Sequence, residues 1–148
     1  MKTFYLDTSI FVSAFWKKHP NFEPSFALIS QYKKCKFLTS NHTLVEYYSV
    51  MTRLPLPMKM EPSLIYTVIQ ENIFPHVSIF SLTEKETLAF LKQAGTLQIV
   101  GGNIHDYYHF QVAQKKKVDA IITWNTKDFL KFSEEIEIKT PNQLMMNS

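Results

Sequence analysis

Residues 3–9 read TFYLDTS, a short apolar run that ends at an aspartate. The run Thr3–Leu6 is rich in β-branched and aromatic residues, which favours a buried strand. Asp7 follows this strand directly, and the longer amphipathic stretch Thr8–Phe15 favours a helix. We therefore expect Asp7 at the carboxyl end of a first strand, where the chain turns into a helix.

The same alternation of short apolar runs and longer amphipathic stretches continues along the chain. Further strands are expected at Lys36–Thr39, Val77–Leu82, Ala120–Thr123 and Ile136–Ile138. Further helices are expected at Glu23–Tyr32, Asn41–Arg53, Pro62–Ile73, Thr83–Gly95 and Ile104–Gln114, with a turn or helix from Thr140 to Ser148. Five strands separated by helices predict an α/β fold, namely a three-layer sandwich with a five-stranded, mostly parallel sheet and helices on both faces.

Local signals mark several helix ends. Ser40 or Asn41 suits the N-cap of the helix after the second strand, and Pro62 suits the first position of the next helix. The segment Thr83–Glu86 fits a capping box, and Gly95 is expected to close the helix that this box opens. A further helix is expected to open at an asparagine, residue 103.

Length and composition favour one folded domain over residues 1–148. Apolar residues make up 45% of the chain and aromatic residues 14%, too much for a disordered segment. The net charge of +3 permits an anionic partner without requiring one. The sequence has no apolar run of the ~18 residues that a membrane span needs, and Asp7 interrupts any signal-peptide core. We expect a soluble, cytoplasmic protein with no membrane partner.

Cys35 is the only cysteine in the chain. A disulfide and a cysteine-based zinc site are therefore excluded within one chain. The lysines beside Cys35 could lower the pKa of a nucleophilic thiol, but an incidental residue at the start of a strand is the simpler interpretation.

Oxygen-bearing side chains follow the ends of the expected strands. Asp7 follows the first strand, and Glu46 lies in the first two turns of the helix after the second. Asp106 lies in the first turn of the helix before the fourth strand, and Asn125 and Asp128 follow that strand. Parallel strands end at one edge of a sheet, and their helices run in the opposite direction. Four chain segments therefore bring oxygen ligands to the same edge.

Converging carboxylates repel each other and are costly to desolvate unless a cation neutralises them. Mg²⁺ or Mn²⁺ is the natural counter-ion, and such an ion suits phosphodiester hydrolysis. Each acid also has a structural interpretation: Asp7 could cap a helix, Asp106 could complement a helix dipole, and Asp128 could cap a turn. Glu46, inside an apolar run, is harder to explain in that way.

Four segments, in this order, resemble the motifs of PIN domains. They read FYLDTS at residues 4–9, VEY at 45–47, NIHDYYH at 103–109 and IITWNTKDF at 121–129. The resemblance spans residues 3–130, and the length is similar to that of small prokaryotic PIN proteins such as the toxins of VapBC toxin–antitoxin pairs. It implies a Mg²⁺- or Mn²⁺-dependent endoribonuclease with an RNA substrate, a homodimer, and a small antitoxin that blocks the site.

By the same resemblance, Asp7, Glu46 and Asp106 would be metal ligands, and Thr123 would orient a ligand or the attacking water. Many family members carry an aspartate where Asn125 stands, and an asparagine offers a carbonyl oxygen without charge. Asp128 could compensate as a further metal ligand, or a second ion could bind weakly or only with substrate.

Basic and aromatic residues suggest a surface for RNA. Residues 1–36 carry six lysines against two acids, and Lys115–Lys117 forms a second cluster. Both clusters could bind phosphates, although lysines also commonly end a helix. The aromatic residues that could stack on bases, or instead pack in the core or a dimer interface, are Trp16, Tyr47, Tyr48 and Trp124.

His105 and His109 share one face of a helix and, with the aspartate between them, suggest a histidine-based metal site. Such a site needs further histidines, and the spacing of His19, His42 and His76 shows no suitable pattern. His105 or His109 could instead have a minor role at the rim of the carboxylate site.

Two other functions stay open. The chain could be a catalytically weakened module of the same fold that binds RNA or a protein partner, which Asn125 motivates. It could also be an unrelated α/β enzyme, such as a flavodoxin-like phospho-acceptor domain, with Asp7 as the acceptor and Lys127 as a weak candidate for the charge-balancing lysine.

Overall fold

The computed structural model describes residues 1–55 and 57–146 of the chain. Its strands form one sheet in the order β3-β2-β1-β4-β5, and every neighbouring pair is parallel. The strands are β1 (Lys2–Leu6), β2 (Cys35–Ser40), β3 (Val77–Phe80), β4 (Ala120–Ile122) and β5 (Glu137–Lys139). Each overlaps its expected range, so the predicted α/β fold with a parallel sheet is confirmed.

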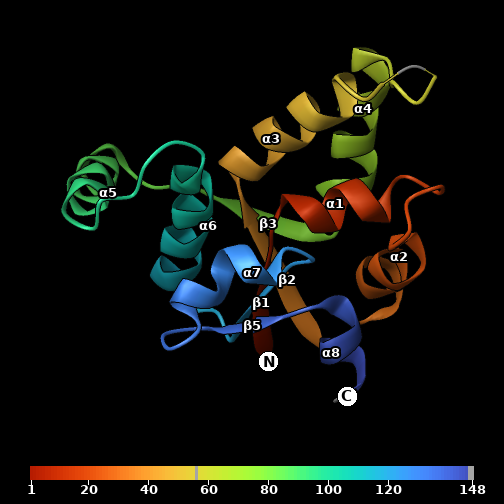
Figure 1. Cartoon of the computed structure of the whole chain (residues 1–148). Helices are drawn as coiled ribbons and strands as arrows, with labels where there is room; N and C mark the ends of the chain where they lie inside the picture. Colours follow the sequence, from red (N-terminus) through yellow and green to blue (C-terminus); the bar gives the residue numbers. More distant parts are fainter. Residues whose placement is uncertain (56, 147–148) are drawn as a thin grey trace.

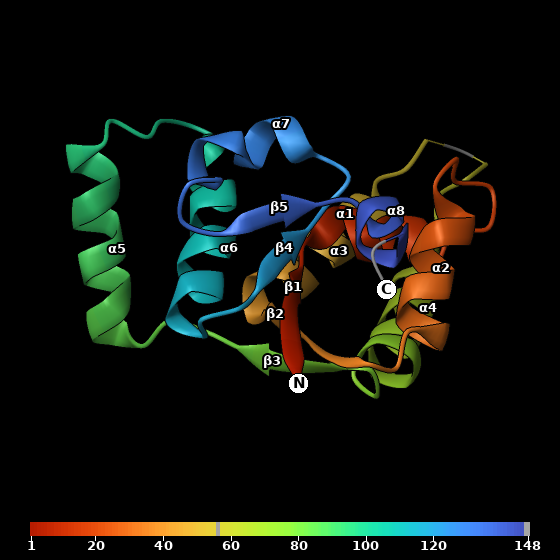
Figure 2. The same cartoon turned by 90° about the horizontal axis from the view of Figure 1, so that it is seen from below.

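Helices cover both faces of the sheet (Figures 1 and 2). One face carries α1 (Thr8–Ala14), α2 (Phe22–Gln31), α3 (Asn41–Thr52), α4 (Pro62–Val68) and α8 (Pro141–Met146). The other carries α5 (Glu84–Thr96), α6 (Asn103–Lys115) and α7 (Thr126–Phe129), and Figure 2 shows α5 as the outermost helix, beyond α6. Within the described part of the chain, no helix is both long and apolar enough to cross a membrane.

The strands are buried on both faces because successive side chains alternate between two cores. Phe4 and Leu6 of β1 join the core under α1 to α4, whereas Tyr5 between them faces α6. Ile122 and Ile121 of β4 divide in the same way. Each fully buried large apolar side chain stabilises the fold by about 1.5–3 kcal/mol, so both faces contribute.

Three of the expected helix signals are confirmed. The Ser40 hydroxyl caps α3 by accepting from the N–H of Thr43. Pro62 occupies the first turn of α4. The Thr83 hydroxyl and the Glu86 carboxylate form the predicted capping box at the start of α5.

Gly95 does not close its helix, contrary to the expectation. Helix α5 continues to Thr96, and the left-handed residue beyond it is Gln98, with a φ of 56°. The N–H of Ile99 donates to the carbonyl of Ala94 at 2.9 Å, which is the long bond of a Schellman turn. Ile99 packs against the core between α5 and α6, and this hydrophobic contact sets where the turn falls.

Other boundaries also differ from the expectation. Asn103 is the first residue of α6 and not its cap, which is Gly102, and no side chain caps this helix. The helix expected over Pro62–Ile73 changes to a π-helical turn at Ile69–Ile73. The short α7 was not expected, because four residues carry no readable period. The terminal segment forms α8, and residues 147–148 lie outside the described residues.

Tyr47 is an exception within the well-packed core under α3. Its side chain is fully buried, and its hydroxyl is the one buried side-chain polar atom in the described chain without a hydrogen-bond partner. A buried hydroxyl without a partner costs about 1–3 kcal/mol. We therefore expect Tyr47→Phe to raise the free energy of unfolding by about 1 kcal/mol in urea denaturation. A less stable variant would contradict this interpretation.

Candidate metal centre at the carboxyl edge of the sheet

Asp7 lies where the strand order of the sheet reverses. The chain leaves β1 for β2 on one side, whereas β4 joins β1 on the other side. The carboxyl ends of β1 and β4 therefore form the topological switch point, where α/β folds bind ligands. The N–H of Asp7 donates to the carbonyl of Ile122 at 3.3 Å, and the Asp7 side chain is only 3% exposed.

Two hydroxyl groups fix the Asp7 carboxylate. Ser9 donates to Oδ1 from its hydroxyl at 2.6 Å and from its backbone N–H at 3.1 Å, so Asp7 also caps α1. Thr123 donates to Oδ2 at 2.8 Å and itself accepts from the N–H of Asn125 at 2.9 Å. The orienting role that the resemblance implies for Thr123 is compatible with this geometry. Ser9 was not singled out, although a serine two residues after an aspartate is typical of such a turn.

Among the described residues, the Asp7 carboxylate forms no ion pair with a lysine or arginine. Burial raises the pKa of the Asp7 carboxyl, the charge of His109 and the hydrogen bonds from Ser9 and Thr123 lower it, and the charge of Glu46 raises it further. Among the described residues, no lysine or arginine lies within 4.0 Å of the Asp7 carboxylate. A buried carboxylate without a cation is costly, so this site fits a divalent cation.

Glu46 reaches the same edge from the second turn of α3. Its Oε1 accepts hydrogen bonds from the Thr8 hydroxyl at 2.9 Å and from Nε2 of His109 at 2.7 Å. Burial alone would raise the pKa of Glu46, but the hydrogen bond and charge of His109, together with the bond from Thr8, hold it at about 2. Glu46 is therefore ionised at neutral pH.

His109 lies inside the fold, whereas a place at the rim was expected. Its side chain is 3% exposed, and its Nδ1 shares a hydrogen bond of 2.6 Å with the Tyr5 hydroxyl. That hydroxyl in turn donates to Ser40 Oγ at 2.8 Å. The hydrogen-bond chain thus runs from the sheet through Tyr5 and His109 to Glu46 and orients the carboxylate, as an outer-shell partner does in metal sites.

We expect His109→Gln to make the stability of the protein less dependent on acid pH. The depressed pKa of Glu46 contributes stability that is present above the ordinary value of 4.5 and is lost as the pH falls through about 2. Without the imidazole, this contribution shrinks, so the variant loses more stability at pH 7 than at pH 3. Urea denaturation at both pH values measures the difference, and an equal loss at both would contradict the role of His109.

Asp106 and Asp128 approach this edge from the other side. Asp106 lies in the first turn of α6, as expected, and Asp128 lies in α7. Burial and the charge of Asp128 raise the pKa of Asp106 to about 6, with smaller opposing effects from His109 and Lys131. In the described structure, neither aspartate forms an ion pair within 4.0 Å. The two carboxylates therefore repel each other, and no described ion pair neutralises either of them, which favours a bound cation.

A compact set of ligand atoms occurs at the same edge. His42, Glu46 and His105 each offer one ligand atom, and in the described residues these three atoms lie within 4.8 Å of one another. Burial lowers the pKa of His42, opposed by the charge of Glu46. The expectation that His42 has no place in a ligand pattern is wrong, because it lies one helical turn before Glu46. Asp7 and Asp106 do not belong to this compact set, and their ligand roles stay predictions.

A cleft opens beside Glu46. It has a volume of about 470 Å³ and is lined by residues that include Thr8, His19, Glu46, Trp124 and Asn125. Trp124 is half-buried, and its indole N–H donates to Ser25 Oγ at 2.7 Å. The cleft therefore combines a fixed aromatic ring, an amide and the ionised Glu46.

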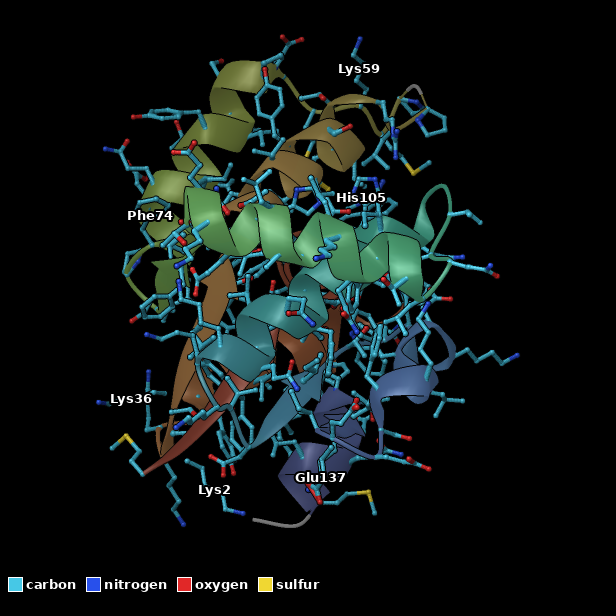
Figure 3. All side chains as sticks on the ribbon, turned by 90° about the vertical axis from the view of Figure 1, so that its left-hand side faces the viewer. Lys2, Lys36, Lys59, Phe74, His105 and Glu137 are labelled. Atoms are coloured by element: carbon cyan, nitrogen blue, oxygen red, sulfur yellow. The ribbon has the colours of Figure 1, made fainter. Side chains whose placement is uncertain are left out.

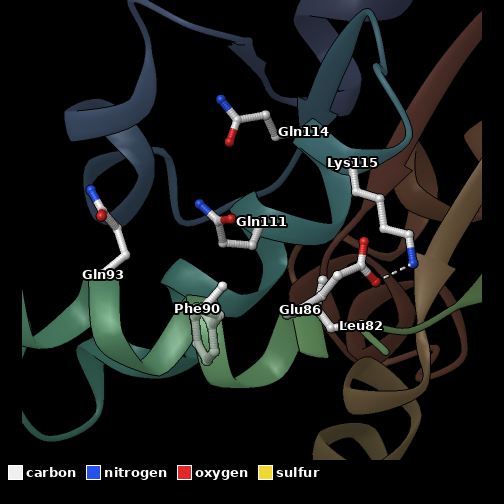
Figure 4. A pocket seen from close by; sticks show the side chains of 8 residues that line it. Leu82, Glu86, Phe90, Gln93, Gln111, Gln114 and Lys115 are labelled. Carbon is white, nitrogen blue, oxygen red and sulfur yellow. Dashed lines mark hydrogen bonds and ion pairs between the residues drawn. The ribbon is translucent and has the colours of Figure 1, made fainter. Parts of the chain in front are cut away.

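Most of the expected basic and aromatic surface lies elsewhere. Figure 3 shows Lys2 and Lys36 at the opposite end of the molecule from His105. Lys115 ends α6 far from Asp106 and pairs with Glu86 at 2.7 Å beside a pocket between α5 and α6 (Figure 4). Tyr47 is a core residue, as described above. Lys17 and Lys18 directly precede His19, which lines the cleft, and both lysines are exposed.

The comparison with known families identifies the class of the chain. The model of the PIN domain matches residues 4–135, and the chain therefore belongs to the PIN domain family. This assignment replaces the phospho-acceptor alternative. No curated protein sequence matches the chain significantly.

Solved structures share the fold at low sequence identity. VapBC-1 of nontypeable Haemophilus influenzae is 17% identical with a TM-score of 0.65, covering 95% of this chain and 98% of that chain. VapC20 of Mycobacterium tuberculosis, described as a toxin that cleaves the sarcin–ricin loop, is 18% identical with a TM-score of 0.59, covering 80% and 86%. FitAcB of Neisseria gonorrhoeae is 17% identical with a TM-score of 0.61, covering 93% and 97%.

Proposed function

We propose that this chain is a Mg²⁺- or Mn²⁺-dependent endoribonuclease and the toxin of a type II toxin–antitoxin pair. The observation that carries the proposal is the buried Asp7 carboxylate, which lies at the switch point of the sheet beside Glu46 and forms no ion pair with a described lysine or arginine. Membership of the PIN family and the likeness to VapC20, described as a toxin that cleaves the sarcin–ricin loop, support the substrate class.

The residues of the site have two roles in this proposal: some would bind the ion, and others orient its ligands. Asp7, Glu46 and Asp106 would hold the cation, with Asp128 close enough to act on the charge of Asp106. A bound divalent ion supplies a water of lowered pKa and positive charge for the phosphate. Thr123 and Ser9 keep the Asp7 carboxylate in one orientation. Asn125, at the mouth of the cleft, presents an uncharged amide toward substrate or a water.

The cleft beside Glu46 supplies a surface for single-stranded RNA. Trp124 is held by Ser25 and could stack on an unpaired base, while the exposed Lys17 and Lys18 attract the phosphates that continue away from the site. The lysines at the opposite edge of the sheet, such as Lys2 and Lys36, are not part of this surface.

An antitoxin and a second copy of the chain complete the proposal. The similar structure VapBC-1 carries the name of a VapBC toxin–antitoxin pair, which supports a small protein partner that covers the carboxylate edge. The exposed apolar side chains of α5, among them Leu88 and Leu91, offer area for a homodimer or for that partner.

Metal removal tests the activity directly. Purified protein treated with EDTA should not cleave single-stranded RNA, and either Mg²⁺ or Mn²⁺ should restore cleavage, whereas Ca²⁺ should bind without comparable activity. Glu71→Gln changes an exposed carboxylate in the π-helical turn after α4 and serves as the control that keeps full activity. Cleavage that persists in EDTA would contradict the metal-dependent mechanism.

A catalytically weakened binding module remains the second candidate, because the uncharged Asn125 lies at the cleft. Calorimetry with Mn²⁺ separates the two candidates. Heat of binding in the micromolar range favours the enzyme, and no binding at millimolar Mn²⁺ favours the module. In the second case, Asn125→Asp should restore metal uptake.

A further inference from the structure

We infer that His42, Glu46 and His105 form a second metal site, selective for a borderline transition-metal ion of the Zn²⁺ type and distinct from the carboxylate site that Asp7 and Asp106 would form. The ligand atoms of the three residues already lie within 4.8 Å of one another. Two imidazoles with one glutamate constitute a donor set known from zinc centres that keep one position open for water.

Two helices bring the ligands together. His42 and Glu46 lie four residues apart on α3, so they share one face of that helix. His105 lies in the first turn of α6, which begins next to α3 (Figure 3 marks His105). Because all three residues belong to regular helices, their backbone positions are fixed before an ion arrives, which lowers the cost of binding.

The distances suit a tetrahedral ion. Nε2 of His42 lies 2.8 Å from Nδ1 of His105 and 3.8 Å from Oε1 of Glu46. Tetrahedral Zn²⁺, with bonds of about 2.0–2.1 Å, places neighbouring ligand atoms about 3.3 Å apart, between these two values. The two ring nitrogens already point at each other through a shared proton. An ion can replace that proton with a shift of about half an ångström at these two contacts, and the remaining pair of ligand atoms lies within 4.8 Å.

Glu46 is prepared as a ligand by its neighbours. Its two hydrogen bonds, from Thr8 and His109, both fall on Oε1. No described residue donates to Oε2, so the carboxylate can bind an ion through Oε2 while Oε1, the oxygen 3.8 Å from Nε2 of His42, keeps its two hydrogen bonds. Hydrogen-bonded carboxylates of this kind are the usual ligands of metal sites, since the outer partners orient them.

The opening of the site favours an ion with a bound water. His105 is exposed, and a hollow of about 310 Å³ lined by His42, Glu46, Arg53 and His105 leads to it. Solvent can therefore supply the fourth ligand. Imidazole nitrogens favour Zn²⁺, Ni²⁺ or Co²⁺ over Mg²⁺, which prefers oxygen ligands, so the metal preference of this site differs from that of the carboxylates.

Direct metal binding tests the inference without RNA. Tag-free protein should bind one Zn²⁺ in competition with a chromogenic chelator, and Co²⁺ should give the intense visible absorption of a tetrahedral site. His42→Ala and His105→Ala should each weaken Zn²⁺ binding by about 100-fold, at least the effect of losing an outer-shell partner. His76→Ala removes an exposed imidazole on another segment and should leave the affinity unchanged.

The outcomes are unambiguous once circular dichroism shows that the variants are folded. Loss of affinity in both ligand variants, with wild-type affinity in His76→Ala, supports the site. Wild-type affinity in either His42→Ala or His105→Ala overturns it. His105→Asn is the second variant should the alanine change at this position disturb α6, and it should lose the Co²⁺ spectrum as well.

One consequence rests on the proposed function. Because Glu46 belongs to both ligand sets, Zn²⁺ at the histidine site withdraws it from the carboxylate site, so Zn²⁺ should inhibit Mn²⁺-dependent RNA cleavage. Inhibition should need higher Zn²⁺ concentrations in His105→Ala. If the chain does not cleave RNA, the zinc-binding measurement still shows whether the histidine site exists. A failure of the proposed RNA cleavage is therefore distinguishable from a failure of the proposed zinc site.

Discussion

Asp7→Asn is expected to reduce Mn²⁺-dependent RNA cleavage by about a thousandfold, the equivalent of about 4 kcal/mol of transition-state stabilisation. The substitution removes one charge from the centre of the site and leaves its shape unchanged. An asparagine can still accept from Ser9 and still cap α1, because asparagine and aspartate are equally good caps. Initial rates with a defined RNA, at saturating Mn²⁺, measure the effect.

The same substitution should leave the fold at least as stable as the wild type in metal-free buffer. Burial raises the pKa of the Asp7 carboxyl, so the ionised carboxylate destabilises the folded state at neutral pH. Removing the charge therefore removes this destabilisation. An inactive variant with an unchanged or higher melting temperature confirms a functional role for Asp7. An inactive variant that melts far below the wild type would instead indicate a structural role.

Asp106 should couple metal binding to pH. Its folded-state pKa of about 6 lies above the ordinary value of 3.8, so its contribution to stability without metal is complete below about 3.8 and is lost as the pH rises through about 6. A metal ion binds the ionised form and reverses this trend. At about 100 times its dissociation constant, Mn²⁺ should stabilise the wild type by about 2.7 kcal/mol at pH 8. Most of this stabilisation should be absent at pH 5.

Asp106→Asn isolates the contribution of the Asp106 charge from that of the other site residues. The variant should be more stable than the wild type at pH 8 without metal, and Mn²⁺ should no longer raise its melting temperature by more than a small amount. Thermal denaturation with and without Mn²⁺ at pH 5 and pH 8 gives all the required values. A Mn²⁺ shift that is equal in variant and wild type would remove Asp106 from the ligand set.

Much of the fold follows from local patterns. The TFYLDTS segment, the capping box at Thr83 and Pro62 at a helix start act over a few residues, and all three occur in the structure as expected. The patterns failed where a tertiary contact outweighed a local preference. Gly95 lies inside α5 because the packing of Ile99 sets the turn further along, and α7 is too short to show a period.

Some features of the candidate site could likewise be predicted from local patterns, and others could not. The positions of Asp7, Glu46 and Asp106 at one edge follow from the order of strands and helices, since a parallel sheet aligns its carboxyl ends. The role of His109 does not follow, because its bonds to Tyr5 and Glu46 join residues more than sixty positions apart. The number of lysines in residues 1–36 likewise suggested a surface for RNA phosphates. Lys2 and Lys36, however, lie at the end of the sheet opposite the candidate site.

The amino-acid sequence alone was enough to establish the parallel α/β architecture and the acidic edge, because alternation, caps and strand ends are local properties that each segment carries with it. The pairing of His42 with His105, the burial of His109 and the side of the molecule on which each lysine lies were decided only by the packing of α3 against α6 and of both helices on the sheet. Distances between segments far apart in the chain depend on how all the layers pack together, and no single segment encodes them.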